Sequence, residues 1–367
     1  MSTTAESSVT GRAVRFVVPE AIADPATVSG GNVYDLALRD GLTALGWDVR
    51  MVPAPLGERG MHAVLSDAPD GALVLVDGLL AGSAPDAFVR GSGRLVLVVL
   101  AHMVAASITS ADERAEAAER ERRAFDAARY IVATSAWTRD ELLSEGISRP
   151  GRVVVARPGT VASSAATGSP SGARLLCVGV VAPHKGQDLL LRALAGLDER
   201  PEWTCTFAGS VDLDPEFAGT LKDLAAASGL ADRVHFTGVL SRNELEEAYA
   251  STDLLVVPSR AESFGMAAAE ALAHGIPVLA TRVGGVPEAV SNSGAALLVP
   301  PDDPWALRVV LEQWCTDAAR RQALKAEAVQ AMAGNRTWSE TARIVDVALT
   351  DVLAGSDSTA GEEARRV

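Results

Sequence analysis

The sequence predicts an α/β protein built from two doubly wound domains, each with a parallel sheet between helices. Short apolar runs that indicate buried strands alternate with stretches of helical spacing, first over 13–156 and again over 175–281. Between these series, residues 161–172 change to Ala, Ser, Thr, Gly and Pro without an apolar period, which is typical of a linker. The length of 367 residues also exceeds the size at which one hydrophobic core usually stops growing.

The N-terminal domain is predicted over 13–160, after a polar, disordered tail over 1–12. It begins with a strand, a loop containing proline and glycine, and a helix. The predicted strands are 13–18, 73–76, 95–100, 130–133 and 153–156, and the predicted helices are 33–45, 112–128 and 138–145. Strands that alternate with helices imply a parallel sheet with right-handed crossovers.

The C-terminal domain is predicted over 173–336, where the same alternation restarts after the linker. Its predicted strands are 175–178, 204–208, 234–237, 254–257 and 278–281, and its predicted helices are 187–197, 215–228, 242–250 and 266–274. An Ala- and Arg-rich segment over 305–332 follows. A helix over 337–354 could return to the N-terminal domain, and a disordered tail is expected over 355–367.

Composition excludes several classes of partner. The formal net charge of −14 argues against a nucleic-acid partner, which would require clustered Lys and Arg. The N-terminus lacks the apolar region of a secretory signal, and the apolar runs are too short to span a bilayer, so a soluble cytoplasmic protein without an integral membrane segment is expected. Cys177, Cys205 and Cys315 have no paired spacing and are expected to be buried or inert.

The most informative stretch is 258–288, which reads PSRAESFGMAAAEALAHGIPVLATRVGGVPE. Glu262 follows a predicted strand, at the sheet edge where open α/β sheets bind ligands, and Glu270 lies just over one turn into the next helix. Gly265 allows close approach of a ligand, and the N–H groups at the start of this helix can hold an anion. The alternative is a buried, Ala-rich helix with a polar cap and Glu270 on its wet face.

This stretch closely resembles the signature of the retaining glycosyltransferases of family 4, the glycosyl transferases group 1, which have the GT-B fold of two Rossmann-like domains facing across a cleft. Flanking residues in family positions are Pro258, Gly275, Pro277, Gly284, Gly285, Pro287 and Glu288. The resemblance implies that Glu262 hydrogen-bonds a hydroxyl of the transferred sugar and that Glu270 accepts from the ribose hydroxyls. The backbone of Phe264, Gly265 and Met266 would face the sugar and the diphosphate.

A second loop, 178–186 (VGVVAPHKG), is expected to face the phosphates. Members of the family usually carry an Arg and a Lys here, which neutralise the diphosphate as it leaves. This sequence has Lys185, one of its three lysines, but Val180 replaces the Arg, and one cation is a weaker clamp than two. His184 or Arg260 could compensate, and a chance surface lysine is the alternative.

The N-terminal domain matches the family at two places. Gly30 and Gly31 lie in a turn that the resemblance places beside the diphosphate and the acceptor, and His102 matches a histidine that contacts the donor sugar near the reacting carbon. A plain turn and a structural histidine are the alternatives. The residues expected to line the acceptor cleft are Asn32, Asp77 and Met103.

Neither a metal site nor a dinucleotide site is expected. Asp212 and Asp214 have the D-x-D spacing that binds a metal in a different glycosyltransferase fold, but they fall in a loop between a strand and a helix. No G-x-G-x-x-G opens the first helix, which argues against NAD.

Taken together, the sequence predicts a metal-independent retaining glycosyltransferase without a cofactor. It would move a hexose-type sugar from a UDP- or GDP-linked donor to a glycan or a small, secondary-metabolite acceptor, by front-face displacement without an enzyme nucleophile. The catalytic residues implied are Glu262, His102 and Lys185. A nucleotide-sugar epimerase and a non-catalytic nucleotide-sugar-binding protein remain as alternatives, and the oligomeric state stays open.

Overall fold

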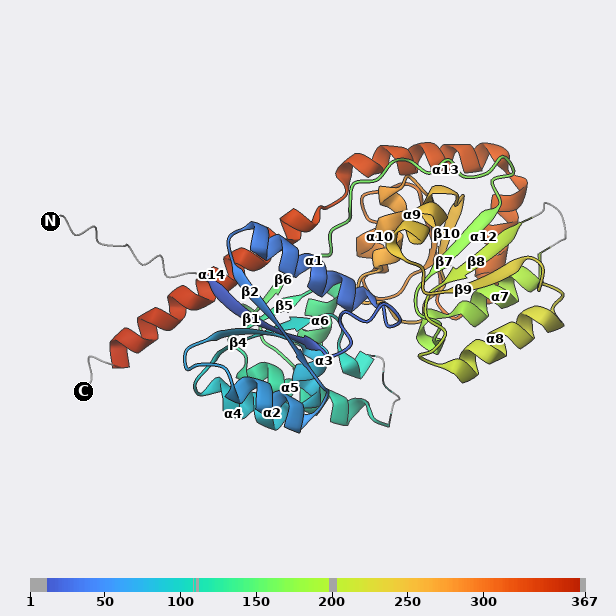
Figure 1. Cartoon of the computed structure of the whole chain (residues 1–367). Coiled ribbons are helices and arrows are strands. Elements are labelled where there is room, and N and C mark those ends of the chain that lie inside the picture. The colour runs from blue at the N-terminus through green and yellow to red at the C-terminus, as the bar shows by residue number, and fades with distance from the viewer. Residues whose placement is uncertain (1–11, 108, 110–111, 198–202, 364–367) are drawn as a thin grey trace.

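The computed structural model describes residues 12–107, 109, 112–197 and 203–363. Two six-stranded sheets, both wholly parallel, form the centres of two domains (Figure 1). Helices cover both faces of each sheet, so the predicted class of two doubly wound α/β domains is confirmed. In the described part of the chain, no helix is long and apolar enough to cross a membrane.

The N-terminal sheet has the strand order β2-β1-β3-β4-β5-β6. Its strands are β1 (Ala13–Pro19), β2 (Asp48–Ala54), β3 (Leu73–Asp77), β4 (Val96–Ala101), β5 (Tyr130–Ala133) and β6 (Val153–Val155). One face packs against α1 (Gly30–Ala44) and α14 (Trp338–Glu363). The other packs against α2 (Glu58–Ser66), α3 (Gly78–Ser83), α4 (Pro85–Ser92), α5 (Arg114–Ala127) and α6 (Ala136–Ser144).

The C-terminal sheet has the strand order β12-β11-β10-β7-β8-β9. Its strands are β7 (Arg174–Val178), β8 (Thr204–Ala208), β9 (Val234–Gly238), β10 (Leu254–Val257), β11 (Val278–Thr281) and β12 (Ala296–Val299). One face packs against α7 (Gln187–Ala195), α8 (Pro215–Ala227) and α12 (Pro304–Thr316). The other packs against α9 (Arg242–Ala250), α10 (Met266–Ala273), α11 (Val286–Ala289) and α13 (Ala318–Ala331).

Each sheet reverses its strand order beside its first strand, between β1 and β3 in one domain and between β7 and β10 in the other. Connections on the two sides of such a point cover opposite faces of the sheet, and this leaves a crevice at the carboxyl ends of the strands. The residues that the sequence assigns to the site lie in the loops after β4, β7 and β10, at the end of β3, and in the first turns of the helices α1 and α10.

Several elements of the structure were not predicted. Strand β2 is an edge strand with mostly half-exposed side chains, so it lacks the continuous apolar run of a buried strand. Helix α3 spans only 6 residues and α4 only 8, which is too short for a clear helical period. The segment 305–332 is divided at Asp317, whose side chain accepts from the N–H of Arg320 and caps α13. Helix α14 continues to Glu363, past residue 355, where a disordered tail was predicted.

The segment 161–172 contains no helix or strand, and hydrogen bonds hold it against the C-terminal domain. The N–H of Thr167 donates to the carbonyl of Ala250 at 2.9 Å, and the N–H of Ser169 donates to the buried carboxylate of Asp253 at 2.9 Å. Asp253 also pairs with Lys325 at 2.8 Å. The segment is therefore tied to one domain along much of its length.

The C-terminal helix α14 packs beside α1 in the N-terminal domain (Figure 1). A side-chain carbon added at Gly41 of α1 would lie 2.5 Å from Cβ of Ala342, so glycine permits this close approach. Tyr34 of α1 makes an edge contact with the ring of Trp338 at 5.3 Å between centroids. The chain thus passes between the domains twice.

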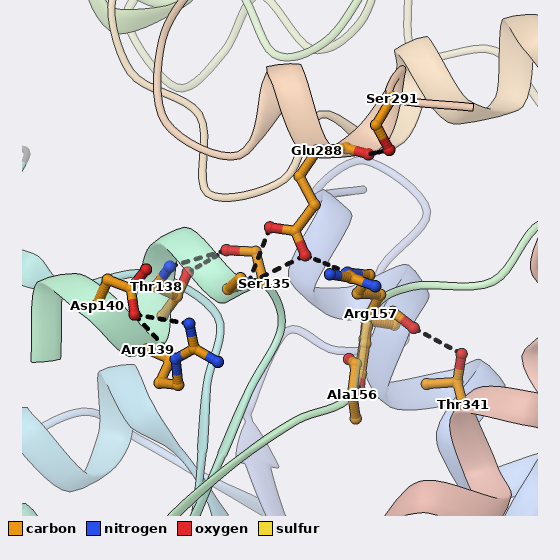
Figure 2. A network of polar contacts seen from close by, with 11 residues as sticks. Ser135, Thr138, Arg139, Asp140, Ala156, Arg157, Glu288, Ser291 and Thr341 are labelled. Atoms are coloured by element: carbon orange, nitrogen blue, oxygen red, sulfur yellow. Dashed lines mark hydrogen bonds and ion pairs between the residues drawn. The ribbon is translucent and has the colours of Figure 1, made fainter. Parts of the chain in front are cut away.

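Glu288 connects the domains through a polar network (Figure 2). Its carboxylate, in α11, accepts from the N–H of Ala136 at 2.8 and 3.1 Å, at the first residue of α6, and it pairs with Arg157. The carbonyl of Arg157 accepts in turn from Oγ1 of Thr341 in α14 at 2.7 Å. One carboxylate therefore joins the C-terminal domain to the positive end of a helix in the other domain.

Candidate functional site

A cavity of about 330 Å³ lies between the domains, lined from the loops at the carboxyl ends of both sheets. It brings together ten of the residues that the sequence assigns to the site: Gly30, Gly31, His102, Met103, Lys185, Glu262, Phe264, Gly265, Met266 and Glu270. Asn32 and Asp77 do not line it. The side chain of Asn32 donates to the carbonyl of Thr27 at 3.0 Å, and Asp77 is buried at the start of α3, where it accepts from the N–H of Leu79 at 2.7 Å.

Lys185 and Glu262 form an ion pair on the C-terminal side of the cavity. Nζ of Lys185 lies 2.6 Å from Oε1 of Glu262, and Oγ of Ser259 donates to the same oxygen at 3.0 Å. Lys185 ends a short 3-10 turn after β7, and Glu262 lies in the loop after β10. The two strands are neighbours at the point where the strand order reverses, which is why the two loops meet.

Glycines let the loops around Glu262 pack backbone against backbone. Gly284 has φ +52°, and a Cβ there would lie 1.6 Å from the carbonyl oxygen of Glu262. The N–H of Gly285 donates to that same carbonyl at 3.1 Å. Gly186, with φ +67°, would similarly meet the carbonyl of Pro258 at 2.1 Å. These glycines hold the acidic loop in place, and any side chain would displace it.

The start of α10 presents free N–H groups to the cavity. Gly265 has φ +98°, a left-handed conformation that favours glycine, and it turns the chain into the helix. Within the described residues, no hydrogen bond uses the N–H of Phe264, Gly265 or Met266. Unpaired donors at the positive end of a helix form a site for an anion such as a phosphate.

Glu270 lines the cavity and is held by Tyr249 of α9. The hydroxyl of Tyr249 donates to Oε2 of Glu270 at 2.9 Å, and the Tyr249 ring stacks on His274 with 4.7 Å between centroids. Burial raises the pKa of Glu270, although the hydrogen bond from Tyr249 opposes the rise. Tyr249 was not predicted as a site residue, because a buried aromatic residue on a helix looks like ordinary core.

His102 faces the cavity from the N-terminal domain with a carboxylate behind it. Nε2 of His102 lies 2.7 Å from Oδ1 of Asp35 and 3.5 Å from Oδ2 of Asp77. Burial opposes the charged ring, but the charge and hydrogen bond of Asp35, together with the charge of Asp77, raise the pKa of His102. Asp35 was missed, although it lies on the apolar stripe of α1 with Leu38 and Leu42, where a charged residue is unusual.

The cation expected to compensate for Val180 is not Arg260. The guanidinium of Arg260 is held by Asp188 at 2.8 and 2.9 Å and by Asp302 at 2.6 Å, and it does not line the cavity. His184 does line it, but burial and the nearby Lys185 lower the pKa of His184. Lys185 is the one lysine or arginine among the described residues that line the cavity.

The side chains that could hold a metal ion have other partners. Asp214 of the D-x-D segment caps α8, where it accepts from the N–H of Phe217 at 2.9 Å. In the described ranges, one trio has ligand atoms within 4.8 Å of one another, namely Asp35, Asp77 and His102. A separation of 2.7 Å between Nε2 and a carboxylate oxygen is that of a hydrogen-bonded pair, so we assign no ion to these side chains.

The three cysteines are buried and unpaired in the C-terminal domain. Burial raises the pKa of the Cys177 thiol to about 12, which keeps it protonated and unreactive.

Comparison with known proteins shows what this chain is similar to. Residues 165–331 match the family model for glycosyl transferases group 1. A D-inositol 3-phosphate glycosyltransferase of Streptomyces avermitilis is 36% identical over 211 residues, covering 53% of this chain and 46% of the relative. One from Kineococcus radiotolerans is 36% identical over 248 residues, covering 60% of this chain and 57% of the relative. The chain thus spans about half the length of these relatives.

Solved structures share the fold along nearly the whole chain. Sucrose-phosphate synthase from Thermosynechococcus elongatus superposes with a TM-score of 0.77 at 21% identity, covering 94% of this chain and 100% of that one. Anabaena HepE in complex with UDP and glucose superposes with a TM-score of 0.72 at 18% identity, covering 93% and 100%. The identities are low, so this similarity establishes the GT-B fold alone.

Proposed function

We propose that this chain, which belongs to the glycosyl transferases group 1 and has the GT-B fold, transfers a sugar from a nucleotide-diphosphate donor to an acceptor, with retention of configuration. The observation that carries the proposal is the cavity itself. It joins a cation, a carboxylate and free helix N–H groups from one domain to a histidine from the other domain and to Gly30 and Gly31, which begin α1 and do not form the predicted turn.

The donor is proposed to bind along the C-terminal wall of the cavity. Glu270 would accept from the ribose hydroxyls of a UDP- or GDP-linked sugar, and the free N–H groups of 264–266 would hold its diphosphate. Glu262 would accept from a hydroxyl of the hexose. Because Lys185 lies 2.6 Å from Glu262, the sugar and the phosphate would meet at this pair.

The proposed reaction is a front-face displacement. The bond between the anomeric carbon and the diphosphate oxygen breaks, the acceptor oxygen bonds to the same face of that carbon, and the departing oxygen takes the acceptor proton. Negative charge accumulates on the diphosphate, where Lys185 and the N–H groups of α10 stabilise it. The enzyme would supply position and charge, with no metal and no covalent intermediate.

The N-terminal wall suggests an uncharged acceptor. The apolar side chains on this wall are Val28, Val33, Met103 and Pro158, and its described residues include no lysine or arginine. A phosphorylated acceptor would need several cationic side chains, and His102 is the one basic side chain among the described residues of this wall, whereas its apolar surface fits a small secondary metabolite. Of the three residues predicted for the acceptor, the proposal keeps Met103, because Asn32 and Asp77 do not line the cavity.

The test combines donors with acceptors in one matrix. UDP-, GDP- and ADP-sugars are incubated with and without aromatic alcohols, inositol and D-inositol 3-phosphate, in excess EDTA, and products are followed by mass spectrometry. Acceptor-dependent transfer, with the anomeric proton coupling of the donor kept in the product, supports the proposal. Interconversion of the donor sugar without an acceptor would indicate an epimerase, and binding without turnover would indicate a non-catalytic protein.

The same matrix tests the charge of the acceptor and the need for a metal separately. A preference for D-inositol 3-phosphate over every uncharged alcohol would overturn the uncharged acceptor. Activity lost in EDTA and restored by Mg²⁺ or Mn²⁺ would overturn metal independence.

A further inference from the structure

Two buried carboxylates converge on one ring nitrogen of His102. Oδ1 of Asp35 is 2.7 Å and Oδ2 of Asp77 is 3.5 Å from Nε2, and the exposed fractions of these two acidic side chains are only 1% and 6%. Oδ2 of Asp35 is buried and has no partner among the described residues. An ionised carboxylate only accepts hydrogen bonds, so we assign the proton of the contact with Asp35 to Nε2.

The second ring nitrogen of His102 remains available. No hydrogen bond of the described residues uses Nδ1, and this atom is not among the buried polar atoms that lack a partner. Gly31 lies against the opposite edge of the ring, where an added Cβ would be 3.4 Å from Cδ2. Because His102 lines the cavity, Nδ1 is the atom it can offer to a ligand.

The groups around His102 favour a charged ring. Asp35 comes from α1 and Asp77 from the end of β3. Burial raises the pKa of Asp77 to about 6, and the charge of His102 opposes the rise. Tyr34 of α1 contacts the ring edge, and its hydroxyl donates to the carbonyl of Ala156 at 2.8 Å and stays neutral. Directly after β5, Thr134 donates from its hydroxyl to the carbonyl of His102.

In the C-terminal domain, two charges that line the same cavity balance each other. Lys185 and Glu262 form their own ion pair, so they add little net charge near the ring. Two ionised carboxylates beside a neutral imidazole leave a charge of −2 in a buried site. Protonation of the imidazole reduces that charge to −1, and burial makes the larger imbalance the more costly one.

We propose that Asp35, supported by Asp77, is a positioning residue that keeps His102 doubly protonated, so that Nδ1 donates a charged hydrogen bond into the cavity. His102 would then serve as a fixed cation on the N-terminal wall and not as a base. This role partly replaces the charge that Val180 does not provide on the opposite wall. The use of the cation in sugar transfer rests on the proposed function, whereas the protonation state does not.

The protonation state can be measured directly by NMR. The protein is labelled with ¹⁵N at its five histidines, the His102→Asn variant identifies the His102 signals, and both ring nitrogens are followed from about pH 5 to pH 9 without substrate. Asp35→Asn removes the charge, and Asp40→Asn is the matched control on the same helix, because Asp40 is exposed and pairs with Arg39 on the surface.

Wild-type His102 should show both nitrogens protonated at neutral pH, with a midpoint above the ordinary histidine value. Asp35→Asn should move that midpoint to lower pH, and Asp40→Asn should not. A wild-type midpoint at or below the ordinary value of 6.5 overturns the proposal, as does an unshifted midpoint in Asp35→Asn. If Asp35→Asn does not fold, the wild-type titration and Asp77→Asn test the proposal instead, and Asp77→Asn should also move the His102 midpoint to lower pH.

Two further measurements separate this proposal from others. Zn²⁺ added to EDTA-treated protein should leave the His102 signals unchanged, and stoichiometric binding that abolishes their titration would show a metal site instead. Where transfer is observed, Asp35→Asn should lower kcat at about pH 8 roughly tenfold with little change in KM, and kcat should recover as the pH falls. A protein that shows the NMR result without any transfer would overturn the proposed function and leave the protonation intact.

Discussion

Nζ of Lys185 and Oε1 of Glu262 lie 2.6 Å apart, so in the free protein the cation assigned to the diphosphate neutralises the carboxylate assigned to the sugar. A bound donor would present a phosphate to one partner and a hydroxyl to the other. Each side chain would therefore exchange its present partner for the donor without leaving a charge unpaired, which makes this pair a sensitive place to test the proposed reaction.

Lys185→Ala should lower kcat by about 10²–10³ with a smaller effect on KM, because the charge on the leaving diphosphate grows in the transition state. Steady-state kinetics with saturating acceptor measure both constants. Lys222→Ala is the matched control, since Lys222 is exposed on α8. If Lys185→Ala kept most of its turnover, the placement of the leaving group would be wrong.

Val180→Arg should tighten binding of the nucleoside diphosphate about tenfold, because it adds a second cation to the cavity. Val180 lines this cavity, and Lys185 is the one lysine or arginine among its described lining residues. Calorimetry at low and high ionic strength checks this, and the gain should shrink with salt. Val180→Met controls for side-chain length without charge. If Val180→Arg and Val180→Met changed the affinity equally, the added charge would not be the cause of the tighter binding.

Glu270→Ala should weaken binding of the nucleoside diphosphate by about 1–3 kcal/mol, because a carboxylate that accepts from ribose hydroxyls is lost. Burial raises the pKa of Glu270, so its ionised form, and with it the advantage of the wild type, should diminish as the pH falls. Calorimetry at several pH values measures the difference. Glu247→Ala, on the exposed face of α9, should bind as the wild type does.

Glu121→Gln should change how stability depends on pH. Burial raises the pKa of Glu121 to about 7, although backbone hydrogen bonds from Ala105 and Ala106 oppose the rise, and Oε2 has no partner among the described residues. The stabilising contribution of the neutral acid is complete below the ordinary pKa of 4.5 and is lost as the pH rises through about 7.

The free energy of unfolding of wild type should therefore fall relative to Glu121→Gln between these pH values, by on the order of 3 kcal/mol. Urea denaturation at a series of pH values measures it. Glu116→Gln, exposed on the same helix, should follow the wild type. If the free energies of unfolding of wild type and Glu121→Gln changed in parallel with pH, the carboxylate of Glu121 would be solvated at neutral pH.

Glu288→Ala should loosen the contact between the domains, because it removes the acceptor for the N–H of Ala136 and the partner of Arg157. Hydrogen exchange at Ala136 should accelerate by an amount equivalent to about 1–3 kcal/mol. Glu288→Gln keeps an acceptor oxygen, so its exchange rate at Ala136 should lie between those of the wild type and Glu288→Ala. Unchanged exchange in Glu288→Ala would show that this contact does not hold the domains together.

The sequence alone determined the class of fold, because buried parallel strands and helices have distinct apolar patterns that depend on neighbouring residues. It also brought together residues of the C-terminal wall of the cavity, since Glu262, Gly265 and Glu270 lie within one strand-loop-helix unit. The positions of these residues along the chain already place them at one edge of the sheet.

Other relationships were decided by the tertiary structure. His102 and its partner Asp35 are 67 positions apart, and Glu288 and Ala136 are 152 apart, on elements whose relative placement no local pattern records. Arg260 shows the converse, because it is close in sequence to Glu262 but its guanidinium is held by Asp188 and Asp302 outside the cavity. Which charges face the substrate depends on how helices pack on the two sheets, and packing is a property of the whole chain.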